Sequence, residues 1–421
     1  MKILVSNYTH PGITNYTTIL FKNTLPILKK TKDVHLFWAI HNNFSNLENK
    51  LKENETILKI RDFQNAVEMI EFVKPDLVFV IAGLSAPDYA FYLAAKFLKI
   101  PIIGGQTSAP FFKLQEKKEL FKTYISQFFQ SSSSDNNKTE IKGKKLWEKY
   151  MFMVNTMRSV NMSKINIIHE FLEYIIAHFT SNYNRKINSK FKCDKIFVDS
   201  ENEQKKKIAE GYYINSLVVT GNPSYDKVIN HIMRNKTKKN KNKKIRILFL
   251  TVNLEGQGGN WTKKKRNFML KEFIRICSKE NYEISIKIHP SGEKLDEYQN
   301  ITKNFSSEIK IFQKDDLINC LENTDIVFSM SSSTAGLIAL LLKKPMIIWN
   351  FFNVKNDIFL DNKLIIECKN IEKLPEYIKQ ILDTNCASKE ILNKIISDIL
   401  YKADGKASER ITKEILKVIQ K

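Results

Sequence analysis

Three short polar segments in the second half of the chain contain the residue types that bind phosphate. They are residues 251–260 (TVNLEGQGGN), residues 289–292 (HPSG) and the turn at residues 331–334 (SSST). Glycines let backbone N–H groups approach an anion, imidazole and hydroxyl groups donate hydrogen bonds to phosphate oxygens, and proline holds the chain extended. Together the three segments predict a site for a phosphate or diphosphate group.

The turn at residues 331–334 lies between an apolar run and a helical segment. The N–H groups of a helix start and the positive end of its dipole favour an anion there, although an ordinary helix cap would explain Ser and Thr equally well. The GQGG sequence is neither GxGxxG nor a Walker loop, so the prediction depends on the order of the three segments. The residues predicted to bind the phosphates are Thr251, Asn253, Gly256, Gly258, His289, Ser331, Ser332, Ser333 and Thr334.

Each of these segments follows a predicted strand, and the carboxyl ends of parallel strands meet at one edge of a sheet. Strands are predicted in the second half at residues 245–252, 284–288, 309–312, 326–330 and 346–349. In the first half they are predicted at 3–6, 34–39, 77–82, 102–104, 195–199 and within 216–223, with helices at 15–29, 62–73 and 87–98. Short apolar runs that alternate with segments of helical period indicate an α/β fold. We expect two doubly wound Rossmann-like domains that face a cleft.

The length of 421 residues exceeds one ordinary core and supports this division. The predicted domains are 1–233 and 245–421, joined by a charged linker at 234–244. A nucleic-acid arm is a weaker interpretation of the linker because no aromatic residue is interleaved for base stacking. Residues 111–192 have helical period and form a predicted helical insertion. It is expected to pack against the first sheet, and docking on anionic lipid is the alternative.

The charge of the chain favours anionic partners, since 67 Lys and Arg exceed 45 Asp and Glu and give a formal net charge of +22. Five scattered cysteines without C-x-x-C spacing indicate neither a disulfide framework nor a zinc site. The chain starts with a strand-like run rather than a signal peptide, and its apolar runs are shorter than the roughly 20 residues of a membrane span. We expect a cytoplasmic protein, with peripheral association at the inner face of the membrane as an open alternative.

Four sequence blocks carry a resemblance to a known superfamily. In order they are TGNPSYD (220–226), HPSG (289–292), SSSTAGLIALLLKKPMI (331–347) and DGKASERI (404–411). This set resembles the carboxyl-terminal half of the two-domain GT-B superfamily over roughly residues 194–421. Within that superfamily the chain resembles bacterial capsule and lipopolysaccharide glycosyltransferases, glycerophosphotransferases of wall polymers, and non-hydrolysing UDP-N-acetylglucosamine 2-epimerases.

The resemblance implies a nucleotide-sugar donor bound mainly to the second domain, with its diphosphate near His289 and the serine turn. It implies an acceptor, a glycan or glycolipid, on the first domain and no separate cofactor. A non-enzymatic module that binds nucleic acid or anionic membrane through its charge is a further alternative, but no known nucleic-acid motif appears, so nucleic acid is not an expected partner. It also implies a carboxyl-terminal helix that returns to the cleft. Further contacts implied in this way are Gly221, Asn222, Asp404, Lys406 and Arg410. For Lys406 and Arg410 a solvated helix face is the alternative.

The sequence departs from the epimerases at two places. They carry an Arg-containing phosphate loop after the first strand, where this chain has Asn7 to Asn15, and an acidic-Ser-Gly-Gly turn where it has SSST. Both differences favour a glycosyltransferase that extends a surface polysaccharide or glycolipid. A sugar-nucleotide epimerase or hydrolase is the first alternative, and a glycerophosphotransferase-like enzyme is the second.

His10, in the loop after the first strand, is the predicted catalytic base. An imidazole with a pKa near 6.5 is suited to deprotonating an acceptor hydroxyl, although His10 could instead cap the turn before the next helix. Asp88 and Glu201 are lesser candidates near predicted strand ends. No two aspartates stand two apart, so the DxD metal motif is absent. The predicted reaction is therefore metal-independent, with hydrogen-bond donors and basic side chains stabilising the leaving group.

Overall fold

The computed structural model describes residues 1–8, 11, 15–41, 53–83, 85–105, 136–180, 185–234, 244–252, 262–289, 293–305, 308–350, 359, 365–383 and 389–420. These residues form two compact units. Within the described residues, the first unit contains 1–105, 136–226 and 397–420, and the second contains 227–396.

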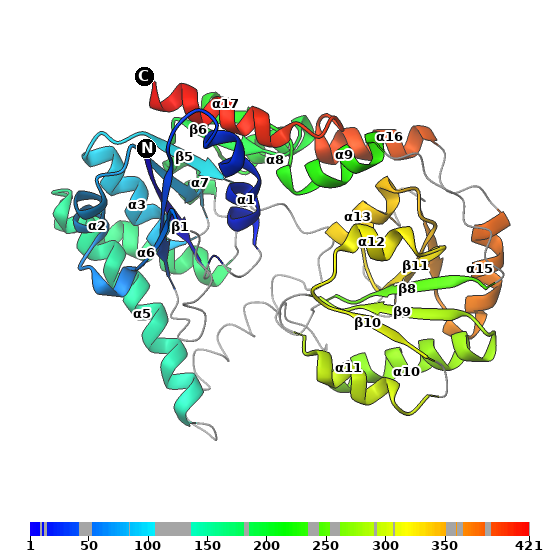
Figure 1. Cartoon of the computed structure of the whole chain (residues 1–421). Helices are drawn as coiled ribbons and strands as arrows, with labels where there is room; N and C mark the ends of the chain where they lie inside the picture. Colours follow the sequence, from blue (N-terminus) through cyan, green and yellow to red (C-terminus); the bar gives the residue numbers. More distant parts are fainter. Residues whose placement is uncertain are drawn as a thin grey trace. The chain divides into compact units, whose positions relative to one another are not determined.

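The first unit is built on a seven-stranded parallel sheet with the order β3-β2-β1-β4-β5-β6-β7. Figure 1 labels β1, β5 and β6 of this sheet. Its strands are β1 (Lys2–Asn7), β2 (His35–Ile40), β3 (Glu55–Lys59), β4 (Leu77–Ile81), β5 (Ile102–Gly105), β6 (Lys195–Val198) and β7 (Leu217–Val219). The connecting helices include α1 (Tyr16–Leu28), α2 (Ala66–Val73), α3 (Ala86–Phe97) and α8 (Glu201–Ala209). The strand order reverses between β1 and β4, which is where ligands of doubly wound sheets bind.

The second unit repeats this plan with a six-stranded parallel sheet of order β10-β9-β8-β11-β12-β13. Its strands are β8 (Arg246–Leu250), β9 (Glu283–Lys287), β10 (Lys310–Phe312), β11 (Ile326–Ser329), β12 (Met346–Trp349) and β13 (Ile366–Cys368). Its helices include α10 (Lys263–Lys279), α11 (Leu295–Thr302), α12 (Leu317–Glu322), α13 (Thr334–Leu341) and α15 (Leu374–Asp383). Helices α9 (Asp226–Arg234) and α16 (Lys389–Leu400) cross the boundaries between the two units, at 226/227 and 396/397. The order reverses between β8 and β11. Two parallel Rossmann-like sheets confirm the predicted fold class.

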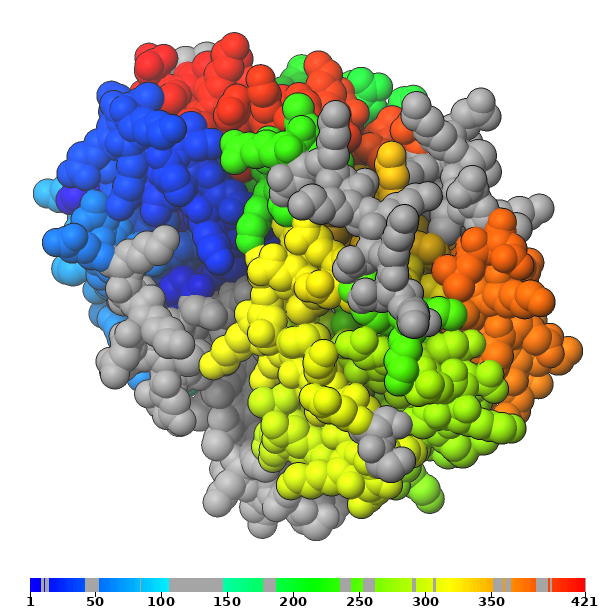
Figure 2. Space-filling view, turned by 45° about the vertical axis from the view of Figure 1, so that its right-hand side comes forward, coloured from blue at the N-terminus to red at the C-terminus, as the bar shows by residue number. Residues whose placement is uncertain are grey.

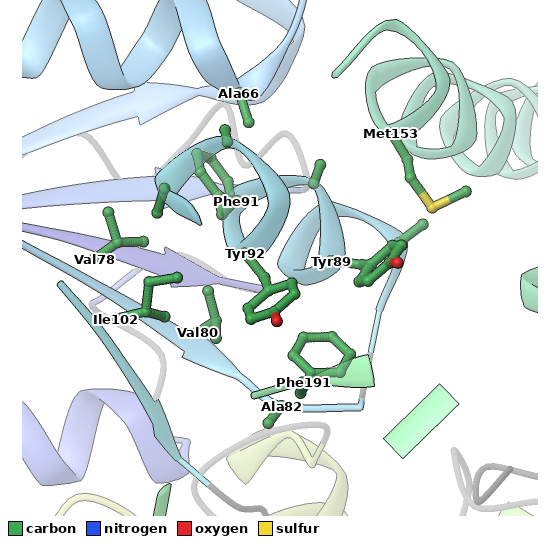
Figure 3. Packing of buried hydrophobic residues seen from close by; sticks show 14 of the residues in the cluster. Ala66, Val78, Val80, Ala82, Tyr89, Phe91, Tyr92, Ile102, Met153 and Phe191 are labelled. Carbon is green, nitrogen blue, oxygen red and sulfur yellow. The ribbon is translucent and has the colours of Figure 1, made fainter. Parts of the chain in front are cut away.

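The described part of the predicted insertion consists of α5 (Asn136–Ser159), α6 (Lys164–Thr180) and α7 (Arg185–Lys190). Its inner face shares one hydrophobic cluster with the first sheet and with α3. Figure 3 shows Met153 of α5 near Tyr89 of α3, and Phe191 beside Tyr92. Ring centroids lie 5.6 Å apart for Tyr89 and Phe191 and 5.3 Å apart for Tyr92 and Phe191. The described part of the insertion therefore packs on the first unit, as predicted.

The last helix, α17 (Ala407–Ile419), belongs to the first unit. Ile411, Ile415 and Val418 are buried in a cluster with α1 and strands β1 and β2. Figure 2 shows this red helix at the surface beside the blue amino-terminal segments. The predicted domain 245–421 therefore includes a segment, from 397 on, that packs with the other unit. The first boundary also differs, at 226/227 instead of 233, while most of the predicted linker (235–243) lies outside the described residues.

Two strands were absent from the prediction. β3 (ETILK) contains polar residues and is only partly buried along its whole length, and β13 has three residues. Both are edge strands, which bury less surface than central ones and so lack a continuous apolar run. Among the described residues, no helix combines the length and apolar character needed to cross a bilayer.

Candidate functional site

The second unit brings the described parts of the three predicted segments to one edge of its sheet. Leu250, at the end of β8, pairs with Lys287 of β9 on one side and with Ser329 of β11 on the other. The residues that follow these strands therefore emerge together, at the point where the strand order reverses. The backbone N–H of His289 donates to the Thr251 hydroxyl at 2.8 Å. Asn253, Gly256 and Gly258 lie outside the described residues.

Glu293, which the sequence analysis did not single out, organises this edge. Its buried carboxylate accepts hydrogen bonds from the Thr251 hydroxyl, from the His289 backbone N–H at 2.8 Å and from the Tyr298 hydroxyl. Burial, together with the Glu293 carboxylate, raises the pKa of Tyr298, so the phenol stays protonated and donates. The Thr251 proton is engaged with Glu293. Thr251 thus fixes the backbone of His289, and its contact with a ligand stays a prediction.

The four hydroxyl residues of the serine turn have four different environments. Ser333 is the N-cap of α13 and accepts from the Gly336 N–H at 3.1 Å, as the helix-cap interpretation requires. The Ser332 hydroxyl accepts from the Phe359 N–H at 3.3 Å. Thr334 is exposed. The Ser331 hydroxyl is buried and, among the described residues, has no hydrogen-bond partner.

That isolated hydroxyl matters because a buried polar group without a partner costs about 1–3 kcal/mol. Ser331 follows β11 directly and precedes the N-terminus of α13, where unpaired N–H groups and the helix dipole favour an anion. The neighbouring backbone is held in place, since the Ser329 hydroxyl donates to the Ser331 carbonyl at 3.1 Å. Only the Ser331 hydroxyl of this turn is both buried and without a described partner, which suits it to a ligand.

The DGKASERI block anchors the tail to the first unit. Arg410 donates to the Thr220 carbonyl at 2.7 Å and to both carboxylate oxygens of Asp404 at 2.8 and 3.0 Å. Asp226 accepts from the N–H groups of Ala407 and Ser408 at 3.0 and 2.7 Å. Arg410 therefore lies in a hydrogen-bonded junction within one unit and not on a solvated helix face.

The remaining predicted residues of this junction have structural contacts as well. Gly221 has a φ of +82°, and an added Cβ would lie 3.2 Å from the Leu400 carbonyl oxygen. The Asn222 amide donates to Asp199 at 2.9 Å. The Lys406 side chain is exposed at the start of α17, and its backbone N–H donates to Asp404 at 3.0 Å. Contact of these residues with a ligand stays a prediction.

The first unit has its own polar cluster at the point where its strand order reverses. The Ser6 hydroxyl of β1 lies 2.7 Å from Asp88 Oδ1 and 2.8 Å from His41 Nε2. Asp88 also accepts from the Ser85 hydroxyl at 2.5 Å and from the Ile81 N–H at 3.2 Å. All three members of the Ser6–His41–Asp88 cluster are buried. His10, the predicted base, lies outside the described residues, while Asp88 is the lesser candidate that the structure places in a cluster.

Burial shifts the pKa values of the two titratable groups of this cluster in opposite directions. It raises the pKa of Asp88 to about 6, against the opposing effect of its hydrogen bonds from Ser85 and Ser6. Burial, aided by the nearby Lys149 cation, lowers the pKa of His41 to about 3. The Lys149 ammonium lies 4.3 Å from the ring centroid of Tyr8, whose ring meets His41 edge-on at 6.3 Å. Near neutral pH the imidazole is uncharged and Asp88 is ionised.

One group of metal-ligand side chains occurs among the described residues, His169, Glu170 and Glu173 on α6. The Lys190 ammonium lies within hydrogen-bond distance of both glutamates. A lysine cation thus already pairs with both carboxylates, and this group does not indicate a metal centre.

Comparisons with solved structures match the whole chain. UDP-GlcNAc 2-epimerase from Methanocaldococcus jannaschii aligns with 99% of this chain and 100% of its own at 16% identity and a TM-score of 0.53. The Neisseria meningitidis UDP-GlcNAc 2-epimerase bound to UDP-GlcNAc gives the same coverage, 16% identity and a TM-score of 0.52. A glycotransferase of kitacinnamycin aligns with 99% of this chain and 98% of its own at 11% identity and a TM-score of 0.51. No protein-family model matches the sequence, and no curated protein does either. At these identities the similarity establishes a GT-B-like fold.

Proposed function

We propose that the protein is a nucleotide-sugar enzyme that binds the donor diphosphate at the carboxyl edge of β8, β9 and β11. The observation that carries this proposal is the buried Ser331 hydroxyl without a described partner, between β11 and the N-terminus of α13. Glu293 holds the neighbouring His289 backbone in place. Solved proteins of the same fold are named as complexes with UDP or UDP-GlcNAc, which supports the ligand class.

A glycosyltransferase that uses a surface polysaccharide or glycolipid as acceptor is the reaction we propose. The chain lacks the Arg-containing first loop and the acidic-Ser-Gly-Gly turn that the epimerase resemblance requires. A transferase needs a base for the acceptor hydroxyl, and the first unit has a buried imidazole and carboxylate at the reversal of its strand order.

A sugar-nucleotide 2-epimerase is the second candidate, favoured by the epimerases that match along their whole length. The two reactions differ in what they need. An epimerase or hydrolase converts the donor alone, whereas a transferase depends on an acceptor. A glycerophosphotransferase-like reaction would consume a nucleotide-activated glycerol phosphate instead of a sugar.

Binding and turnover test these assignments separately. Calorimetric titration with UDP and GDP should show that Ser331→Ala weakens nucleoside diphosphate binding about 10-fold, the equivalent of one hydrogen bond to a charged group. Ser329→Ala is the matched control, because that hydroxyl already has partners in the fold. Equal affinity of the wild type and Ser331→Ala would contradict the placement of the diphosphate. Nucleotide release from a panel of nucleotide-sugar donors, measured with and without acceptor, separates a transferase from an epimerase. Unchanged turnover in His289→Ala would remove His289 from the reaction.

Peripheral association with a membrane is also a proposal. Helix α6 exposes four aliphatic residues at helical spacing, Ile165, Ile168, Leu172 and Ile176. An apolar stripe on a basic protein is suited to an anionic bilayer surface. Sedimentation with anionic liposomes over a salt series tests this, and a protein that stays in the supernatant at low salt would refute it.

A further inference from the structure

The direction of each hydrogen bond in the Ser6–His41–Asp88 cluster follows from the proton count. An ionised Asp88 has no proton to give, so the Ser6 hydroxyl donates to Asp88 Oδ1 at 2.7 Å. Ser6 has one proton only, and its oxygen must then accept from His41 Nε2 at 2.8 Å. His41 is therefore the neutral tautomer with its proton on Nε2. Its other nitrogen, Nδ1, is an acceptor.

That acceptor is buried and, among the described residues, has no partner. A native protein seldom leaves a buried polar atom unpaired without a role for it. Nδ1 is the free end of a chain of hydrogen bonds that leads through Ser6 to a carboxylate. The chain joins β1, the residue after β2 and the first turn of α3, at the reversal of the strand order. A donor at Nδ1 would complete it.

We propose that Asp88, Ser6 and His41 form a proton relay, which takes a proton from a bound hydroxyl at His41 Nδ1 and stores it on Asp88. This inference deepens the proposed function and rests on it, since the hydroxyl would be that of the sugar acceptor. In the step, the ligand O–H bond breaks and its proton joins Nδ1. The Nε2 proton passes to the Ser6 oxygen, and the Ser6 proton passes to Asp88 Oδ1. One proton enters and Asp88 becomes a neutral acid, while His41 remains neutral in its other tautomer.

The groups that face the relay explain why the proton should not stay on the imidazole. Lys149 of α5 faces both His41 and Asp88, so an imidazolium would lie near a second cation. Tyr8 lies at the His41 ring, and Tyr174 of α6 and Cys193 before β6 lie near Asp88. Burial raises the pKa of both Tyr174 and Cys193 and keeps them protonated and uncharged. Asp88, with a pKa of about 6, is the group in the relay best matched to accept a proton near neutral pH.

Replacing Ser6 tests the relay, because Ser6 does not titrate and only connects the other two groups. Ser6→Ala should lower kcat about 100-fold with little change in KM and should abolish the fall in kcat below about pH 6. Ser6→Thr, which keeps the hydroxyl, should restore most of the rate. Ser85→Ala is the matched control, since its hydroxyl also donates to Asp88 but lies off the path to His41. Ser85→Ala should have the same maximal kcat as the wild type. Its kcat should begin to fall at a higher pH, because the variant loses a hydrogen bond that lowers the pKa of Asp88.

A measurement on the free protein separates failure of the relay from failure of the proposed function. With 15N-labelled histidine and His41→Asn for assignment, NMR should show the Nε2–H tautomer of His41. The His41 shifts should follow the titration of Asp88 in the wild type and Ser6→Thr but not in Ser6→Ala. An Nδ1–H tautomer, or an imidazolium near pH 6, overturns the relay even if no donor sugar is turned over. Full kcat in Ser6→Ala overturns it as well.

Discussion

Replacing Asp88 by asparagine should change how the stability of the first unit depends on pH. Raising the pKa of this carboxyl from 3.8 to about 6 means that the fold holds the proton more tightly than the unfolded chain does. The native state therefore binds more protons between these values, and the Asp88 contribution to stability grows as pH falls from about 6 toward about 4. His41 acts in the opposite sense. Its pKa is lowered, so its contribution is complete above about pH 6.5 and is lost in acid.

The magnitude follows from the proton linkage. As the pH falls from about 7.5 to about 4.5, the raised pKa of Asp88 should add about 2 kcal/mol to the free energy of unfolding. Over the same range the lowered pKa of His41 should subtract about 3 kcal/mol from it. The two effects largely cancel in the wild type. Asp88→Asn removes the first effect and leaves the second. The free energy of unfolding of the variant, relative to the wild type, should thus fall by about 2 kcal/mol from about pH 7.5 to about pH 4.5.

Hydrogen exchange read by mass spectrometry provides the assay, because the two units need not unfold together. The ratio of exchange rates between variant and wild type at one pH cancels the intrinsic pH dependence of exchange. In peptides from β1 and β4 this ratio should rise about 30-fold between the two pH values. Asp33→Asn, at an exposed aspartate, controls for the change in net charge. A ratio that falls in acid would mean that Asp88 has a lowered pKa and would refute both the sign and the relay.

Three further predictions concern other parts of the chain. Glu293→Gln should lower the free energy of unfolding of the second unit by about 1–3 kcal/mol, since three donors lose their carboxylate acceptor. An unchanged free energy of unfolding, measured by urea denaturation, would contradict this. Asp226→Ala should expose the α17 junction to protease because Ala407 and Ser408 lose their acceptor, whereas Glu409→Ala, on the exposed face, should not; equal cleavage of the two variants would argue against the junction. Chelation with EDTA should leave turnover unchanged, and a loss of rate restored by a divalent cation would refute metal independence.

Much of the fold could be predicted because parallel strands that are buried on both faces have continuous apolar sequences. The central strands β1, β4, β8 and β11 fit this description. The edge strands β3 and β13 do not, since both are only partly buried, and they were missed for that reason. Helical spacing could not show which unit α17 packs on, since Ile411 and Ile415 have the same spacing whichever surface they cover. The resemblance implied only that this helix returns to the cleft.

The candidate sites show the same limit. The serine turn could be recognised because its residues are consecutive, and the strand before it predicted its place in the sheet. Glu293 carried a weaker signal, as a lone carboxylate four residues after His289. His41 and Asp88 lie 35 and 82 positions after Ser6 in the sequence, and only the strand order brings the three residues together. Sequence patterns predict neighbours along one element, whereas this cluster depends on three.

The return of α17 has a consequence for biosynthesis. Because a ribosome makes the chain in one direction, the apolar surface of α1 that Ile411 and Ile415 cover stays exposed while the second unit is being translated. The first unit is thus the first to begin folding and the last to be completed. A nascent chain stalled before residue 397 would present an apolar surface to chaperones.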